Sequence, residues 1–175
     1  ALNIVGQALE DEAFWGVRKS IVSALGKSKT PFAEAILISS LESEKMADAL
    51  HSTCVACGEH RSKEMATALT AFLHRSDVPY RARGAALSAL GRQNEHCDWD
   101  ILLAAAEDDG WQHFLRRNAV AAVAKTRSER GARLLIERMQ SPDESIGLRA
   151  SAAVGLAACV SNLDRAQKAA ATEAL

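Results

Sequence analysis

The chain has 175 residues, with 21 basic against 22 acidic side chains and a formal net charge of −1. Alanine occupies 34 positions, whereas aromatic residues make up 5% of the chain and there are only three prolines. Because alanine is the best helix former and proline the strongest helix breaker, this composition predicts an all-α protein and excludes a β-sandwich or β-barrel. The balanced charge also argues against a general affinity for nucleic acid or anionic membranes.

The sequence shows neither a membrane span nor a secretory signal. No apolar run approaches the roughly 18 residues that a transmembrane helix needs, and no basic segment precedes a short apolar one. We therefore expect a cytoplasmic protein without a membrane partner. Its four cysteines are expected to be reduced thiols. The chain begins at Ala1 instead of methionine, which favours a fragment of a longer polypeptide.

A short string repeats along the chain. It reads Ala24-Leu25-Gly26 at its first occurrence, and related strings end at positions 58, 91, 124 and 157, at spacings of 32, 33, 33 and 33 residues. In four of the five occurrences an arginine lies eight positions before the end of the string. The second occurrence has Leu50 at that position. Agreement at several offsets predicts structural repeats of this period.

Each period contains two helical patterns. In the first unit, apolar residues at 1, 4, 5 and 8 predict a first helix, and those at 17, 21, 22 and 25 predict a second. The same offsets define units at 1–28, 29–60, 61–93, 94–126 and 127–160, with a partial sixth at 161–175. Ser and Asp residues between the two helices, as in Arg75-Ser76-Asp77, are expected to cap the second helix of each unit.

Stacking follows from this pattern, because a lone helical pair cannot bury its apolar face whereas stacked pairs bury a continuous core. We therefore expect a single domain over 1–175, a right-handed α–α superhelix of about five helical pairs plus one extra helix.

The pattern of an aspartate, an apolar–arginine pair and then alanines resembles the HEAT-like repeats, and most closely the short repeats of phycobilisome lyase-type proteins. Its carriers are Asp11 with Arg18, Asp77 with Arg83, Asp109 with Arg116, and Asp143 with Arg149. The resemblance implies a solenoid in which these residues form a structural ladder between units, interrupted at Leu50. An alternative is that the arginines grip an acidic partner or phosphates, but their fixed register favours the ladder.

A second resemblance concerns the segment from Asp11 to Arg18, with the sequence Asp-Glu-Ala-Phe-Trp-Gly-Val-Arg. It is similar to the C-terminal helical-repeat region of aminopeptidase N-type zinc metallopeptidases. In that family a His-Glu-x-x-His helix and a downstream glutamate hold zinc in a preceding domain. Because none of the five histidines here is followed by glutamate, the resemblance implies a non-catalytic accessory region. Its partner would be a catalytic domain of the same polypeptide.

Two clusters could carry chemistry. Cys54-x-x-Cys57, with His51 and His60 nearby, could be a redox pair or half of a zinc site. Both cysteines occupy positions that other repeats fill with aliphatic residues, so we expect them to pack in the core. The second cluster, Glu95-His96-Cys97-Asp98, places its groups next to one another, and adjacent residues rarely converge on one ion. We therefore predict no catalytic residue, no metal site and no cofactor.

The remaining candidate is a binding surface on the second helices. Positions ten, seven and three residues before the end of each string point away from the predicted core, and in HEAT-like solenoids these helices usually line the concave surface. A groove for a protein or peptide would use Lys19, His51, Arg81, Phe114 and Arg117. Alternatively, this face is solvated or covered within the molecule.

Three functional classes follow: an accessory domain of a metallopeptidase, an independent protein-interaction scaffold, and a nucleic-acid-binding solenoid. The scattered cations disfavour the third.

Overall fold

The computed structural model describes residues 2–159, 168–169 and 172. Within 2–159 the chain forms ten α-helices and two short 3-10 helices, without a strand, which confirms the predicted all-α class. The α-helices are α1 (Leu2–Asp11), α2 (Trp15–Ser28), α3 (Pro31–Ser43), α4 (Ala47–Cys57), α5 (Lys63–His74), α6 (Tyr80–Gly91), α7 (Trp99–Ala106), α8 (Phe114–Thr126), α9 (Glu129–Gln140) and α10 (Ile146–Cys159). The 3-10 helices are η1 (Asn94–His96) and η2 (Trp111–His113). Most of the predicted sixth unit, 161–175, lies outside the described residues.

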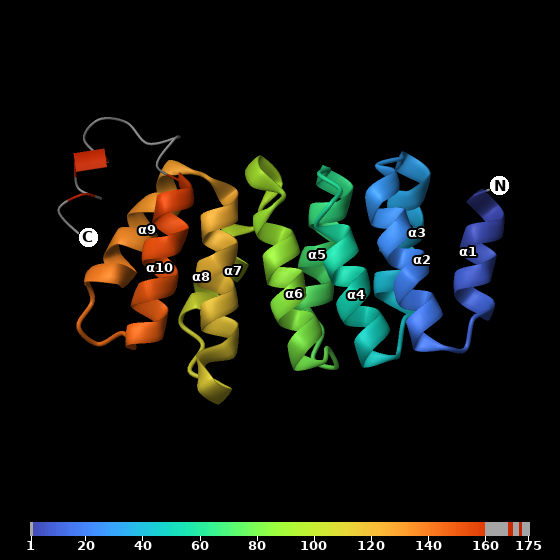
Figure 1. The fold of residues 1–175 in the computed structure, drawn as a ribbon, viewed down its shortest axis with the longest axis horizontal. Helices are drawn as coiled ribbons and strands as arrows, with labels where there is room; N and C mark the ends of the chain where they lie inside the picture. Colours follow the sequence, from blue (N-terminus) through green and yellow to red (C-terminus); the bar gives the residue numbers. More distant parts are fainter. Residues whose placement is uncertain (1, 160–167, 170–171, 173–175) are drawn as a thin grey trace.

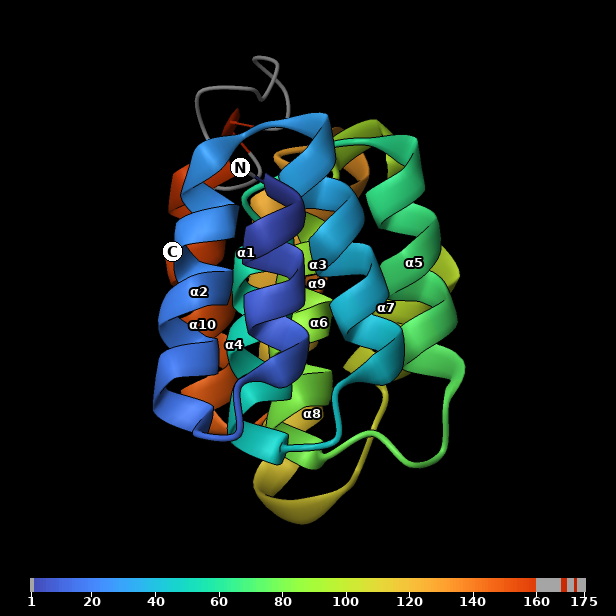
Figure 2. The ribbon, with the colours of Figure 1, turned by 90° about the vertical axis from the view of Figure 1, so that its right-hand side faces the viewer.

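Consecutive helices pack in pairs, and one pair falls within each predicted range from 1–28 to 127–160. The second helices of the pairs (α2, α4, α6, α8 and α10) stack on one another in chain order along the long axis of the molecule (Figure 1). Viewed along that axis, α2, α4 and α10 lie on one side, and α3, α5 and α7 on the other (Figure 2). The second helices form the more tightly packed of the two layers.

The repeated string marks the places where consecutive second helices touch. A Cβ added at Gly26 would lie 3.0 Å from the Cβ of Ala56, and one added at Gly58 would lie 3.2 Å from the Cα of Ala89. The third residue of each string thus meets the first residue of the next. Small side chains at these two positions let the helix backbones approach closely, which explains why the string recurs.

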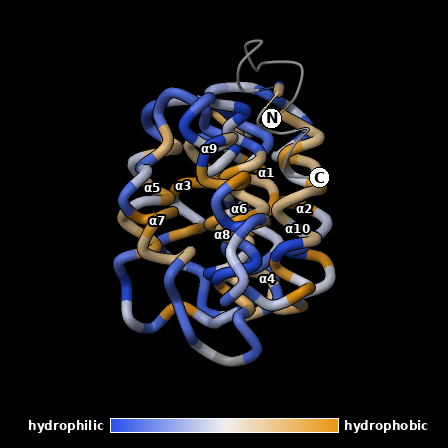
Figure 3. The backbone as a smooth tube through the Cα atoms, turned by 90° about the vertical axis from the view of Figure 1, so that its left-hand side faces the viewer, coloured by the Kyte–Doolittle hydropathy of each residue, from blue (hydrophilic) through white to orange (hydrophobic). Residues whose placement is uncertain are grey.

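The core lies between the two layers. Hydrophobic and hydrophilic segments alternate along the helices, as expected when each helix buries one face (Figure 3). The middle residue of every string is buried, and these residues are Leu25, Cys57, Leu90, Val123 and Leu156. No helix in the described part of the chain is long and apolar enough to cross a lipid bilayer.

The expectation that linker Ser and Asp residues cap the second helices is wrong for α2, α4, α6 and α8. Their N-caps carry no side-chain hydrogen bond; only at α10 does Ser145 Oγ accept from the Leu148 backbone N–H, at 3.3 Å. Side-chain caps lie instead at the first helices, where Thr30, Ser62, Asp98 and Ser128 accept hydrogen bonds from the first turn. The linker carboxylates do not cap the second helices because several of them bind arginines or backbone N–H groups of the linker instead.

Candidate functional site

Three of the four recurring arginines bind the C-terminal end of the first helix in their own pair. Arg18 Nη1 donates to the carbonyls of Leu9 and Glu12, at 2.6 and 2.8 Å. Arg83 donates likewise to the carbonyls of Leu73 and Arg75, at 3.2 and 2.7 Å, and Arg149 Nε to that of Met139, at 2.9 Å. The last carbonyls of a helix have no intrahelical donor, so these guanidinium groups satisfy them.

The second unit lacks the arginine, and a neighbouring unit supplies a replacement. Leu50 is buried in the core. The carbonyl of Leu41, at the end of α3, instead accepts a hydrogen bond from Arg75 Nη1 of the third unit, at 3.0 Å. Asp77 holds the Arg75 guanidinium through two further hydrogen bonds, of 2.9 and 2.8 Å. These hydrogen bonds also lower the pKa of the Asp77 carboxyl.

The aspartates expected in the ladder take different partners. Asp109 Oδ1 lies 3.1 Å from Arg116 Nη1, so this pair is brought together. Asp77 binds Arg75 instead of Arg83, and Asp11 accepts a hydrogen bond from Gln7 at 3.1 Å instead of meeting Arg18. Asp143 is exposed. Its side chain makes no ion pair or hydrogen bond with any described residue, including Arg149.

Two buried glutamates, which the sequence reasoning missed, connect neighbouring pairs. Glu44 is 4% exposed; its Oε2 lies 2.7 Å from Arg18 Nη2 of the preceding pair, and its Oε1 accepts from the N–H of Met46 at 2.8 Å. Glu144 binds Arg116 of the preceding pair and also Arg138, at 2.9 Å. Glu44 lies 33 residues before Asp77, so the repeat register carried a signal for it.

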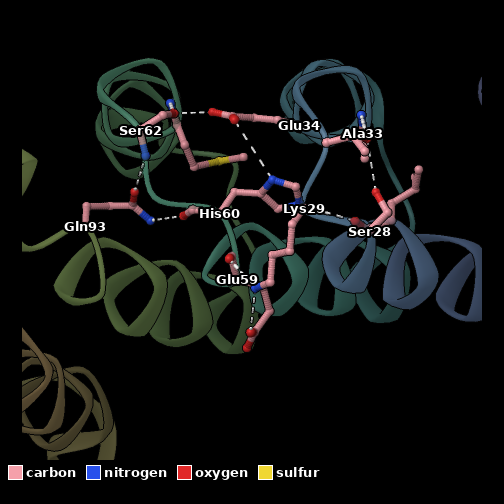
Figure 4. Close-up of polar contacts among 11 residues, drawn as sticks. Ser28, Lys29, Ala33, Glu34, Glu59, His60, Ser62 and Gln93 are labelled. Atoms are coloured by element: carbon pink, nitrogen blue, oxygen red, sulfur yellow. Dashed lines mark hydrogen bonds and ion pairs between the residues drawn. The ribbon is translucent and has the colours of Figure 1, made fainter.

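His60 belongs to a buried polar network at the turn after α4, shown in Figure 4. Its Nε2 lies 3.2 Å from the carbonyl of Leu25, and its own carbonyl accepts from Gln93 Nε2 at 2.9 Å. Ser62 Oγ donates to Glu34, whose other oxygen lies 3.9 Å from His60 Nδ1. These contacts tie the end of α2 to the starts of α3 and α5.

All four cysteines are free and buried. Burial raises the pKa of Cys54 and of Cys97 to about 12, and it also raises the pKa of Cys57 and Cys159. A thiol in this state carries almost no thiolate at neutral pH, and the thiolate is the form that attacks disulfides or binds metals. Within the described residues, no three His, Cys, Asp or Glu side chains gather in a way that could hold a metal ion.

We expect the four thiols to resist labelling by a disulfide reagent at pH 8 in the folded protein and to react rapidly in guanidinium chloride. The cause is the combination of burial and raised pKa, because reaction then requires the core to open. The release of the reagent's thiolate, followed by absorbance, measures this. Labelling of Cys54 and Cys57 at the denatured rate without denaturant would show that the pair is accessible and reactive.

A groove of about 730 Å³ crosses the outer face of α2, α4 and the start of α6. It brings together three of the five predicted residues, Lys19, His51 and Arg81. Val55, three positions before the end of the second string, also lines it, whereas sequence reasoning missed Trp15. Phe114 and Arg117 lie outside it on α8. The Phe114 ring packs against Tyr80, with centroids 5.0 Å apart, while Arg117 is exposed.

The groove combines apolar surface with charges of both signs. Trp15 and Val55 are 43% and 52% exposed. Lys19 and Lys27 contribute cations, while Arg81 is 3.5 Å from Asp48 in an exposed ion pair of the kind that contributes little stability. Such a lining suits a partner that presents an apolar side chain beside polar or acidic groups.

Compared with known proteins, the chain matches no family model, and no curated protein matches it at a significant level.

Proposed function

We propose that this chain is a HEAT-like helical-repeat domain, without catalytic activity of its own, that binds a protein or peptide in the groove of α2, α4 and α6. The observation that carries the proposal is the exposure of Trp15 and Val55 in a hollow of about 730 Å³ rimmed by Lys19, His51 and Arg81. Large exposed apolar side chains within a concave, mixed-charge surface are typical of binding sites.

The arrangement of the second helices supports the proposal. Their close stacking at Gly26–Ala56 and Gly58–Ala89 holds the groove walls on a rigid layer, so little ordering is needed when a partner binds. The half-buried Arg18 and Arg83 satisfy helix-end carbonyls and are therefore occupied, whereas Lys19 and Arg81 are exposed to a partner. A cytoplasmic location is part of the same proposal, because four free cysteines are typical of a reducing compartment.

Substitutions in the groove are expected to weaken partner binding. Val55→Asp places a charge on the apolar floor, and Arg81→Glu reverses a rim cation, so each should weaken binding by roughly tenfold. The measurement is the amount of partner that co-purifies with the intact protein, quantified by mass spectrometry. Ala71→Asp, at an exposed position on α5 in the other layer, is the matched control and should leave binding unchanged. Equal recovery with all three variants would contradict the proposal.

A second candidate is the accessory region of an aminopeptidase N-type zinc metallopeptidase. The observation that favours it is the exposure of Phe14, Trp15 and Val17, at 59%, 43% and 43%, within the segment that carries the resemblance. Side chains of this size are normally covered, and a catalytic domain of the same polypeptide would cover them. Sequencing the reading frame upstream of Ala1 tests this. A His-Glu-x-x-His motif with a downstream glutamate supports it, and a frame without that motif overturns it.

A further inference from the structure

A second hollow, of about 510 Å³, lies at the C-terminal ends of three consecutive second helices, α4, α6 and α8. The residues that line it come from three successive turns and are Arg61, Arg92, Asn94, Lys125, Thr126 and Arg127. Helices packed side by side are about 8–10 Å apart, so the three ends span about 20 Å, the length of roughly six residues of extended peptide.

The lining is strongly positive. Four of the six residues are cations, and no carboxylate is among them. Arg61 is exposed and makes no ion pair or side-chain hydrogen bond with any described residue. Lys125 is half-buried and donates to the neutral hydroxyl of Ser88. Burial and the charge of Arg92 lower the pKa of Lys125, which reflects a shortage of nearby negative charge.

Among the described residues, Glu59 is the carboxylate that offsets Arg92, and it lies outside the lining. Glu59 Oε1 is 2.5 Å from Arg92 Nη1, and Glu59 Oε2 is 3.2 Å from Lys29 Nζ. These two cations lower the pKa of the Glu59 carboxyl. Glu59 is therefore already shared between two partners, which leaves Arg61 and Lys125 without a carboxylate in the described part of the chain.

We propose that this basic hollow is a second binding site, separate from the groove, and that it takes an acidic peptide segment of a partner protein. Guanidinium groups donate paired hydrogen bonds to carboxylates, and Asn94 adds a neutral donor. The restricted size favours a short peptide over nucleic acid, because binding a phosphate backbone needs cations along an extended track.

A simpler role for the cations is to offset the negative C-terminal ends of the helix dipoles. That role predicts changes in stability alone when the charges are reversed. Binding of an acidic probe separates the two roles.

The test is fluorescence anisotropy of the full chain with a labelled hexaglutamate peptide, beside a hexaglutamine peptide of the same length. Hexaglutamate should bind, hexaglutamine should not, and binding should weaken as salt rises. The double variant Arg61→Glu, Lys125→Glu should bind about tenfold more weakly, because two charge-assisted contacts become repulsive. Lys45→Glu, at an exposed position before α4 that lines neither the groove nor this hollow, should change the affinity by less than about twofold.

Three results would overturn the proposal: no binding of hexaglutamate, wild-type affinity in the double variant, or equally tight binding of a single-stranded oligonucleotide of equal charge. Should the double variant fail to fold by circular dichroism, Arg61→Gln at its exposed turn provides the test, with a smaller loss expected. The groove experiment changes Val55 and Arg81, which do not line this hollow. The groove proposal and the hollow proposal can therefore fail independently of each other.

Discussion

Replacing Gly91 by alanine is expected to lower the free energy of unfolding by about 2–4 kcal/mol. The added Cβ would overlap the carbonyl oxygen of Ala122 and lie 2.7 Å from its carbonyl carbon and 2.9 Å from its Cα. These are backbone atoms of the adjacent helix, so no rotation of a side chain relieves the overlap. The two helices, α6 and α8, must separate, which opens the layer that holds the core.

Gly147 is the matched control for this substitution. It also lies in a second helix, α10, but apart from the backbone of its own helix no heavy atom of the described residues stands within 4 Å of an added Cβ. Gly147→Ala should therefore be neutral or stabilise the protein by up to about 1 kcal/mol, because alanine favours the helix. Urea denaturation of both variants measures the difference. Equal stability of the two would show that the close approach of α6 and α8 is not required.

Glu144→Gln is expected to cost about 3 kcal/mol. The Glu144 carboxylate, with its side chain 5% exposed, binds both Arg116 and Arg138, whose side chains are 16% and 12% exposed. Arg116 also contacts Asp109 and Arg138 also contacts Glu107, but both of these carboxylates are exposed, and the buried Nε atoms of the two arginines have no acceptor. A neutral amide would remove the one buried carboxylate that the two cations share and leave each with a single exposed partner.

Asp143→Asn removes the same charge one residue earlier, at an exposed position without contacts to the described residues, and should change stability by less than about 0.5 kcal/mol. Thermal and urea denaturation compare the two variants. Because buried pairs are screened little, the difference should persist at high salt. If Glu144→Gln lowers the free energy of unfolding no more than Asp143→Asn does, the Glu144–Arg116 ion pair does not stabilise the contact between the fourth and fifth helical pairs.

Helix positions could be read from the sequence because they depend on local periodicity. Each predicted range from 1–28 to 127–160 contains one helical pair, and the recurring string proved to be the contact between second helices. The arginine register was also visible. Of the predicted partners, only Asp109 meets its arginine, Arg116. Elsewhere the acid nearest in the chain is not the nearest in space: Arg18 pairs with Glu44, 26 residues away.

The groove was foreseen in part for a similar reason. Lys19, His51 and Arg81 lie together because they occupy adjacent helices. Phe114 was misplaced because Gly84 leaves space on α6, and the Phe114 ring fills that space: a Cβ at Gly84 would lie 2.7 Å from it. The basic hollow was missed because its cations lie at two different distances from the end of the repeated string. No single repeat position therefore carries a cation in every unit.

The most direct test of partner binding in the groove is photo-cross-linking in the intact protein inside its cells. A photoreactive amino acid replaces Val55 on the groove floor and, as the control, Ala71 on α5. We expect a polypeptide adduct from position 55 and none from position 71, with the adduct identified by mass spectrometry. Adducts at position 71 in equal amount, or none at position 55, would contradict the claim that the α2–α4–α6 groove holds a protein or peptide.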